Sequence, residues 1–298
     1  MNVISVGEVL WDVIEGREYL GGAPFNFAAH LHQLGHTVFF VSGVGRDRRG
    51  ERVLKKMTEL GLSTDYVACV ENAATGVVEV RLDAERHPEF IIQRPAAYDF
   101  PSLSPAQLKQ LASKQPDWLY FGTLVQMSPQ AKGLTTRLAA SPAIARRFYD
   151  VNLRAGCYEP SLVRKLMSQA TVVKLNEDES SEIAHMIQRS PHHSLEDFCR
   201  GYAREFGWSA MCVTRGARGC ALLIGNEYVE ADGYAVNVAD TVGAGDAFAA
   251  AFVHGLGSRW PIGEIADFAN RVGALVASRS GATPAWTIAE ARALERAR

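Results

Sequence analysis

Short apolar segments alternate along this chain with longer segments of helical character. The apolar segments show no clean alternation with polar residues, which is typical of strands buried on both faces. We expect strands at Val3–Val6, Val38–Ser42, Trp118–Gly122, Phe148–Val151, Thr171–Leu175 and Ala210–Thr214. Strands that alternate with helices predict an α/β fold with a mostly parallel central sheet wrapped by helices.

Helix starts between these strands carry capping residues. Ser104 precedes Pro105, and Gln107 follows at the third helical position. A serine cap, a proline at the first position and a glutamine at the third together favour a helix N-terminus. Ser128-Pro129 repeats the start, and the run from Thr287 to Glu290 predicts a further capping box.

Two regions predict antiparallel pairing instead. Cys220–Ile224 and Glu227–Ala231 are joined by Gly225-Asn226, which is typical of a hairpin, here at a sheet edge. Thr75–Asp83 and Glu89–Arg94 form two further strands with a charged link, and Leu10–Leu20 adds a third. We expect these to form a small sheet that projects as a lid, with an ordinary edge hairpin as the alternative.

Composition narrows the class of protein. The chain has 298 residues, is 47% apolar and carries a net charge of −2, which suits a large core and argues against a nucleic-acid partner. No apolar run reaches membrane-spanning length and the start lacks a signal-peptide pattern, so we expect a cytoplasmic protein that does not enter a membrane. The five cysteines are widely spaced without CxxC, which predicts free thiols.

No repeat or linker interrupts the pattern. We therefore expect one domain over residues 1–298, with a lid formed by about residues 10–20 and 72–98.

The segment Asp240–Phe248 carries the strongest chemical signal. Gly243 and Gly245 lie just before an alanine-rich stretch, Ala247–Val253, which predicts a helix that ends near Gly255. Backbone N–H groups at a glycine turn and helix start suit an anion. Asp246 lies beside that anion site, where a carboxylate can take a proton from a nucleophile; the alternative is an acid that merely stabilises the first helical turn.

A second glycine motif, Leu20–Ala29 (LGGAPFNFAA), lies near the other end of the chain. Together the two motifs resemble the two signatures of the ribokinase-like, PfkB-type carbohydrate kinases. Further segments match that family in order: Gly45–Gly50, Asp150–Arg154, Lys174–Glu179, Val213–Gly216 and Asn270–Ala274. No GxxxxGK[ST] pattern is present, so the phosphate site is expected at the Gly-Ala-Gly turn.

The resemblance implies a ribokinase-like three-layer α/β/α fold and transfer of the ATP γ-phosphate to a sugar hydroxyl. It implies that Asp246 is the catalytic base and that the amides of Val242, Gly243, Ala244 and Gly245 form an anion hole. It places the sugar at a set that we call the sugar-side residues: Asp12, Gly22, Asn26, Asn152 and Arg154.

Alternatives remain for three of the sugar-side residues. Asn26 also suits a cap of the helix that begins at Pro24, Asp12 suits a loop charge, and Arg154 suits a surface salt bridge.

The same resemblance implies the nucleotide and cation sites. The nucleotide set is Asn176, Thr214, Gly216, Gly219, Asn270, Gly273 and Ala277. The alternative for the last three is close helix packing. Glu179 would bear on Mg²⁺ bound with ATP, acting through water, although Asn176 and Glu179 also have the spacing of a capping box. A K⁺ site is implied at Asp240, Val242, Val276, Arg279 and Gly281, but Ala285 stands where some members carry a serine ligand.

The Leu20–Ala29 and Asp150–Arg154 segments look most like bacterial fructokinases, which implies phosphorylation of D-fructose to fructose 6-phosphate. A 2-keto-3-deoxygluconate kinase is the alternative, and Arg81, Arg94 and Arg154 would suit its acidic sugar. Substrate choice would rest on lid residues such as Arg94 and Tyr98. The lid also implies a homodimer in which two small sheets clasp.

Two other classes of protein fit the sequence less well. A non-catalytic sugar or nucleotide sensor would be expected to lack Asp246 or the glycines at 243 and 245, and all three are present. A Rossmann dehydrogenase would need GxGxxG after the first strand, where Gly7-Glu8-Val9-Leu10 stands instead.

Overall fold

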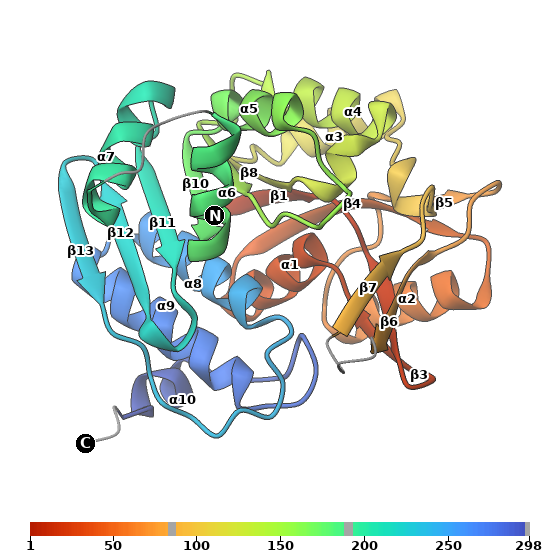
Figure 1. Ribbon diagram of the computed structural model, residues 1–298. Helices are drawn as coiled ribbons and strands as arrows, with labels where there is room; N and C mark the ends of the chain where they lie inside the picture. The colour runs from red at the N-terminus through yellow and green to blue at the C-terminus, as the bar shows by residue number, and fades with distance from the viewer. Residues whose placement is uncertain (83–87, 188–192, 296–298) are drawn as a thin grey trace.

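The computed structural model describes residues 1–82, 88–187 and 193–295, except the side chains of residues 80–82 and 88–90. Within these residues the main feature is a nine-stranded sheet of order β13-β12-β11-β10-β9-β8-β1-β4-β5 (Figure 1). Its parallel strands include all six that the sequence predicts: β1 (Asn2–Val6), β4 (Thr37–Gly45), β8 (Trp118–Gly122), β9 (Arg146–Asp150), β10 (Val172–Asn176) and β11 (Ala210–Thr214).

The two edges of the sheet differ from its centre. At one edge β12 (Cys220–Ile224) and β13 (Glu227–Ala231) form the predicted antiparallel hairpin. The other edge is β5 (Val67–Val70), a parallel strand that pairs with β4 and that the sequence pattern did not indicate. None of its four residues is fully buried, and Cys69 is exposed, so it lacks the continuous apolar run of the inner strands.

Helices cover both faces of the sheet, which confirms the three-layer prediction (Figure 1). One apolar core contains residues of α1, α2, α8, α9 and α10, and a second contains residues of α3 to α7. The first group is α1 (Ala23–Gln33), α2 (Arg48–Glu59), α8 (Ala244–Ser258), α9 (Ile262–Ala277) and α10 (Ile288–Ala293). The second group is α3 (Pro105–Ser113), α4 (Pro129–Ala139), α5 (Pro160–Gln169), α6 (Glu177–Met186) and α7 (Leu195–Phe206). Short 3-10 turns are η1 (Ala97–Asp99), η2 (Leu124–Met127) and η3 (Gly216–Arg218).

The predicted helix starts are confirmed, and one predicted helix end is wrong. Ser104, Ser128 and Thr287 each accept a hydrogen bond from the third helical amide. The alanine-rich helix does not end near Gly255 but continues as α8 to Ser258. Gly255 is needed for packing, because a Cβ there would lie 2.8 Å from the Ile265 side chain of α9.

A separate four-stranded sheet of order β3-β2-β6-β7 forms the lid (Figure 1). Its strands are β2 (Leu10–Ile14), β3 (Arg17–Gly21), β6 (Gly76–Leu82) and β7 (Pro88–Ile92). The expectation of one strand across Leu10–Leu20 is wrong, because that segment turns at Glu15-Gly16 into an antiparallel pair. The charged link between β6 and β7 lies outside the described residues.

The lid is fastened to the main body through α2. Glu18 of β3 forms ion pairs with Arg49, at 2.7 Å, and with Arg52. The Arg52 guanidinium also lies 4.0 Å above the centre of the Trp11 ring of β2. These contacts hold the β2–β3 pair next to the carboxyl ends of the central strands.

No helix in the described ranges is long and apolar enough to span a membrane.

Candidate active site

The N-terminus of α8 lies at the centre of the candidate site. Gly243 is its N-cap, with φ 80°, and a Cβ at this position would collide with the Ala282 carbonyl oxygen. Glycine is therefore required by both the backbone conformation and the neighbouring loop. The Ala244 amide donates to the Thr241 carbonyl oxygen at 3.3 Å, and the Val242 amide of the expected anion hole donates to Asp240 at 3.0 Å. Since the cap has no side chain to accept from the next helical amides, the Gly245 and Asp246 N–H groups are available to an anion.

Asp246 lies in the first turn of α8 and faces α1. Its Oδ2 accepts a hydrogen bond of 2.8 Å from Nδ2 of Asn26. Burial, and then the Asp150 carboxylate, raise the pKa of Asp246 to about 6, against the opposing effects of Asn26, Lys174 and Arg154. A carboxyl group with a pKa close to neutral is suited to exchanging a proton with a substrate.

The contact with Asn26 decides between two readings of that residue. Asn26 does not cap α1, because the helix begins at Ala23 with Gly22 as its N-cap. Its side chain is instead 2% exposed and reaches Asp246, which lies 220 positions away in the sequence. The two glycine motifs of the sequence thus meet at one hydrogen bond.

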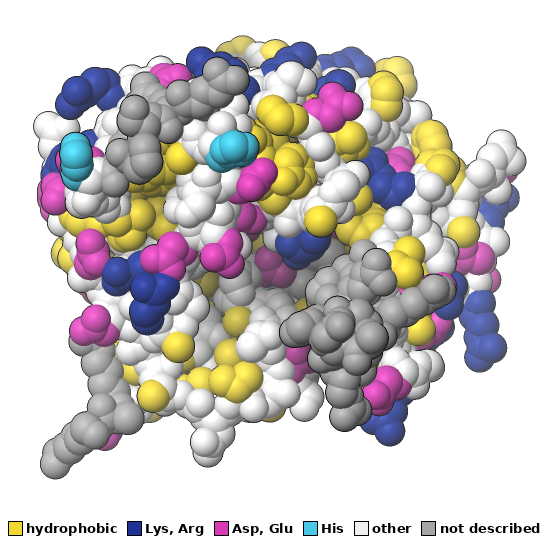
Figure 2. All heavy atoms as spheres, in the orientation of Figure 1, with side chains coloured by type: hydrophobic (Ala, Val, Ile, Leu, Met, Phe, Trp, Pro, Cys, Tyr) yellow, Lys and Arg dark blue, Asp and Glu magenta, His cyan; other side chains and the backbone are white. Residues whose placement is uncertain are grey.

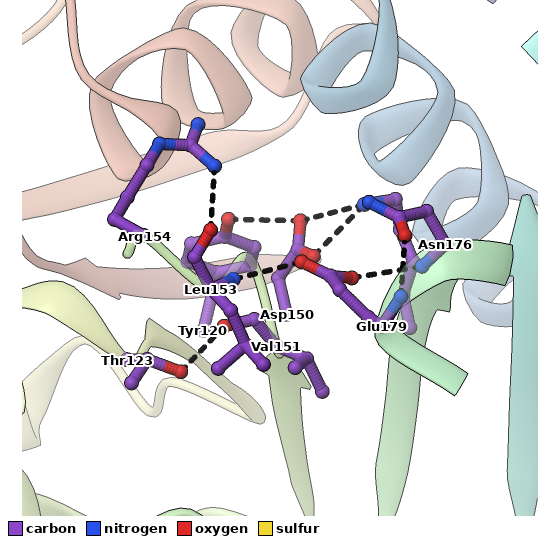
Figure 3. A network of polar contacts seen from close by, with 9 residues as sticks. Tyr120, Thr123, Asp150, Val151, Leu153, Arg154, Asn176 and Glu179 are labelled. Carbon is purple, nitrogen blue, oxygen red and sulfur yellow. Dashed lines mark hydrogen bonds and ion pairs between the residues drawn. The ribbon is translucent and has the colours of Figure 1, made fainter. Parts of the chain in front are cut away.

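A buried ion pair joins β9 and β10, and both of its charges act on the pKa of Asp246 (Figure 3 shows Asp150). Nζ of Lys174 on β10 donates to both carboxylate oxygens of Asp150 on β9, at 2.8 and 3.1 Å, and the Tyr120 hydroxyl donates to Asp150 at 3.2 Å. Burial opposes a charged Lys174, but the carboxylates of Asp150 and Glu179 outweigh that effect and raise the pKa of the lysine. The pair fixes the carboxyl ends of β9 and β10 beside the site.

Glu179 is held by backbone amides on both sides. Its Oε1 accepts from the Leu153 amide at 2.7 Å and its Oε2 accepts from the Asn176 amide at 2.8 Å (Figure 3). The Glu179 amide in turn donates to Oδ1 of Asn176, so the predicted capping box of α6 is formed. No group of three or more His, Cys, Asp or Glu side chains in the described part of the chain could hold a metal.

Asp12 lies in β2 of the lid, and Gly22 is the residue between β3 and α1. Burial raises the pKa of Asp12 to about 6; Arg154 opposes that shift, while Asp240 and Asp246 add to it. These influences place Asp12 in the same electrostatic neighbourhood as the α8 turn. Gly22 has φ 109°, and a Cβ there would lie 2.5 Å from the Glu8 carbonyl oxygen, so the α1 turn passes closely over the end of β1.

The segment after β9 carries the remaining sugar-side residues. Asn152 is partly buried and adopts a left-handed backbone conformation, with φ 39°. Arg154 is exposed and its Nη1 donates to the Leu153 carbonyl oxygen at 3.0 Å (Figure 3). The structure gives Arg154 no ion pair among the described residues, in contrast to the surface salt bridge considered for it.

The proposed nucleotide residues Thr214, Gly216 and Gly219 lie between the carboxyl end of β11 and the amino end of the antiparallel strand β12. Thr214 ends β11, Gly216 begins η3, and Gly219 lies against the Ala231 and Asp232 backbone. The Asn270 side chain is 6% exposed and donates to the Asp232 carbonyl oxygen at 3.2 Å, so α9 is tied to the end of β13.

Gly273 and Ala277 lie along the same helix, α9. A Cβ at Gly273 would lie 3.4 Å from the Ala244 carbonyl oxygen and 3.5 Å from Phe248 Cβ, so this glycine faces the start of α8. This position fits the helix-packing alternative. The Ala277 carbonyl oxygen accepts from the Ala239 and Asp240 amides at 2.9 and 3.2 Å.

The proposed monovalent-cation residues gather around Asp240. Its two carboxylate oxygens accept from the Val242 amide at 3.0 Å and from the Gly281 amide at 3.2 Å. The Val276 carbonyl oxygen accepts from the Arg279 amide at 3.0 Å. Asp240 thus joins the loop before α8 to the loop after α9.

Three residues beside the site were not named as site candidates from the sequence: Glu8, Asp150 and Lys174; Tyr98 was named only as a lid residue that bears on substrate choice. Lys174 lies inside the apolar run of β10, and a lysine buried in a strand signals a buried partner. Glu8 follows the first strand, at the edge where open α/β sheets bind ligands. Tyr98 is fully buried beneath the lid, although the sequence places it only in the lid region.

These parts define a class of chemistry. An acid with a raised pKa, unpaired amides at a helix start and a lid that faces them suit the transfer of an anionic group to a hydroxyl. Figure 2 shows this face of the molecule hollowed at its centre, with acidic and basic side chains around the hollow. The arrangement is that of a phosphoryl-transfer enzyme.

Comparison with known proteins identifies the family. The description "pfkB family carbohydrate kinase" matches residues 3–289. The chain is 28% identical over 282 residues to a fructokinase of Escherichia coli, covering 89% of this chain and 88% of that protein. A solved structure of fructokinase with bound ATP from Xylella fastidiosa has a TM-score of 0.83 and 25% identity, covering 98% of this chain and 97% of that one.

A further solved structure bears on the fold alone. The 2-dehydro-3-deoxygluconokinase of Thermotoga maritima has a TM-score of 0.84 at 18% identity, covering 98% of each chain. Because the family match extends over nearly the whole sequence, this chain belongs to the pfkB family of carbohydrate kinases. Its activity is that of a sugar phosphotransferase.

Proposed function

We propose that this protein is an ATP-dependent fructokinase that converts D-fructose to fructose 6-phosphate. The observation that carries the proposal is the position of Asp246, which lies beside the open amides of α8 and bonds to Asn26 at 2.8 Å. The base, the anion hole and a sugar-side amide are thereby brought to one point. The similarity to proteins named fructokinase supports fructose as the acceptor.

In the proposed reaction Asp246 accepts the proton of the fructose 6-hydroxyl. The hydroxyl oxygen forms a bond to the γ-phosphorus, and the bond from that phosphorus to the bridging oxygen of ADP breaks. The amides of Gly243, Ala244 and Gly245 stabilise charge on the transferring group. At a pKa of about 6, Asp246 is ionised at neutral pH and can act as the base without prior activation.

Mg²⁺ bound with ATP would neutralise phosphate charge during the transfer. Glu179 is oriented for a contact through water, since each of its oxygens already accepts from a backbone amide. We assign the nucleotide to the residues along β10 to β12 and α9 named above, and K⁺ to the loop pair that Asp240 joins. The absence of a serine hydroxyl at Ala285 leaves that K⁺ site with backbone and Asp240 oxygens.

An acidic sugar such as 2-keto-3-deoxygluconate would need a basic residue to bind its carboxylate, whereas fructose would not. Arg94 is engaged within the chain, because its guanidinium pairs with Asp99 and donates to the Leu124 carbonyl oxygen at 2.8 Å. The side chain of Arg81 lies outside the described residues. Of the two of these arginines whose side chains are described, Arg94 is paired and Arg154 is available to a sugar carboxylate. A single available arginine supports a neutral sugar over an acidic one.

ADP release with Mg-ATP over a panel of acceptors tests the proposal. The panel contains fructose, 2-keto-3-deoxygluconate, ribose, tagatose and adenosine, each with and without K⁺. We expect turnover on fructose to exceed the others by at least about tenfold in kcat/KM, the discrimination of one well-placed contact. Preferential turnover of the keto-deoxy acid would replace fructose as the substrate, and ATP binding without turnover on any acceptor would favour a sensor.

We propose further that two lids pair in a homodimer. Ile14 and Tyr19 are exposed on β2 and β3, by 36% and 40%, and apolar groups on a lid face support a contact with a second copy. Sedimentation equilibrium is expected to give a dimer for the natural chain and a monomer for Tyr19→Asp. A monomeric natural chain at micromolar concentration would rule the contact out.

A further inference from the structure

Glu8 and Tyr98 each carry a buried polar atom without a hydrogen-bond partner among the described residues. Glu8 is 4% exposed and Tyr98 is fully buried. Among the described residues, neither Oε2 of Glu8 nor the Tyr98 hydroxyl has a hydrogen-bond partner. Buried polar atoms normally have a partner, and each exception asks for an explanation.

Both residues are positioned by the junction of the main sheet with the lid. Glu8 lies between β1 and β2, at the carboxyl edge of the central sheet. Tyr98 lies in η1, and its ring packs so closely on the lid that a Cβ at Gly76 would lie 2.5 Å from its Cε1 atom. Leu10 of β2 belongs to the same apolar cluster as Tyr98.

Glu8 lies beside Gly22, one of the sugar-side residues, because a Cβ at Gly22 would lie 2.5 Å from the Glu8 carbonyl oxygen. Burial raises the pKa of Glu8 to about 7; its own backbone amide, Arg154 and Arg94 oppose the shift, and Asp246 adds to it. Tyr98 and Tyr120 also lie within the field of Glu8. Glu8 forms no ion pair with Arg94 among the described residues, because Asp99 and the Leu124 carbonyl group engage that guanidinium.

We propose that Glu8 and Tyr98 form the floor of the acceptor pocket, where they bind hydroxyl groups of a neutral sugar and select it over a sugar acid. This inference rests on the proposed sugar-kinase function of the same site. Sugar hydroxyls can donate to Glu8 and accept from the Tyr98 hydroxyl, so a neutral sugar can satisfy both kinds of atom. A sugar carboxylate cannot donate, and it would face a second carboxyl group at short range.

Two variants remove one function each and retain shape. Tyr98→Phe deletes the hydroxyl, and Glu8→Gln removes the acid. We expect each to raise the KM for fructose about 5- to 100-fold, the range for loss of one buried hydrogen bond, with the KM for ATP changed less than about twofold. Above about pH 7, where Glu8 is ionised, Glu8→Gln is also expected to raise the preference for 2-keto-3-deoxygluconate over fructose at least about tenfold, because the repelling charge is gone.

Matched controls separate binding from folding. Tyr66→Phe changes another buried tyrosine, which belongs to a different apolar cluster from Tyr98, and Glu59→Gln changes an exposed acid of α2. Both are expected to keep the natural KM for fructose. Tyr98→Phe should keep the natural melting temperature, since the hydroxyl has no partner in the sugar-free protein, yet lose most of the melting-temperature rise that fructose produces.

The outcomes distinguish this inference from the proposed function. If the natural enzyme phosphorylates no sugar, the proposed function fails, and fructose binding to the natural chain and to Tyr98→Phe by calorimetry still tests the floor. Equal fructose affinity in the natural chain and in Tyr98→Phe overturns the inference, as does a natural preference for the keto-deoxy acid. An unfolded Glu8→Gln variant leaves Tyr98→Phe as the deciding measurement.

Discussion

The replacement Asp246→Asn tests whether this carboxyl group is needed for activity and lowers the stability of the folded protein. The change keeps the side-chain shape and an oxygen that can accept from Asn26 Nδ2, which lies 2.8 Å from Asp246 Oδ2. It removes the proton acceptor, so we expect kcat to fall about 100- to 10,000-fold, the usual contribution of a general base. This corresponds to about 3–5 kcal/mol of transition-state stabilisation.

The same variant is expected to be more stable than the natural enzyme. The pKa of Asp246 rises from its ordinary value of 3.8 to about 6 on folding, and a shift of this size corresponds to about 3 kcal/mol. Since the folded protein disfavours the ionised form, the penalty is absent below about pH 3.8, grows as the pH rises and is complete above about pH 6. Asparagine carries no such penalty at any pH.

Three measurements check the reasoning. ADP release with fructose gives kcat, calorimetry gives the ATP affinity, and urea unfolding at pH 4 and pH 7.5 gives the stability difference. The matched control is Asp178→Asn, an exposed acid in the first turn of α6, which is expected to change stability by less than about 1 kcal/mol at both pH values. ATP affinity should be retained.

Two results would refute the argument separately. Turnover within about tenfold of the natural enzyme would remove Asp246 as the base. A stability gain that does not differ between pH 4 and pH 7.5 would show that folding does not penalise the ionised carboxyl group. The natural kcat/KM should also decline tenfold per pH unit below about pH 6, as the base becomes protonated.

Three further changes test the supports of the site. Lys174→Met leaves the Asp150 carboxylate buried without its cation and should cost about 3–5 kcal/mol in urea unfolding, whereas adding Asp150→Leu should recover most of that loss; an additive double variant would contradict the pairing. Gly22→Ala should lower stability by more than about 1 kcal/mol and raise the KM for fructose, because φ is 109° and the Glu8 carbonyl oxygen lies 2.5 Å from the added Cβ; unchanged values would mean that the turn relaxes freely. Glu179 accepts from the Leu153 and Asn176 amides, and in Glu179→Gln one of these amides would face a side-chain NH₂ group that cannot accept. This change should lower stability by about 1–3 kcal/mol in urea unfolding; a neutral effect would show that water replaces the lost acceptor.

Local signals in the sequence determined most of the secondary structure and the chemistry of the α8 turn. The six inner strands, the caps at Ser104 and Thr287 and the edge hairpin follow from patterns within a few residues. The glycines and Asp246 before an apolar helix indicate an anion site and a base, because those properties belong to the segment itself.

Features that depend on distant partners were not determined locally. The edge strand β5 forms because β4 pairs with it, and α8 continues past Gly255 because Ile265 of α9 packs there. The bond from Asn26 to Asp246 joins positions 220 apart, so no local pattern could choose between a helix cap and a site contact for Asn26.

The pKa values and the unused polar atoms were decided by tertiary structure alone. In the sequence, Glu8, Asp12 and Asp246 are ordinary acids. Their burial in the folded protein raises their pKa values to between about 6 and 7. Desolvation and the proximity of charge depend on which segments meet in space. The sequence by itself therefore determined which residues can react, and the fold decided how strongly each holds its proton and which of them face the sugar.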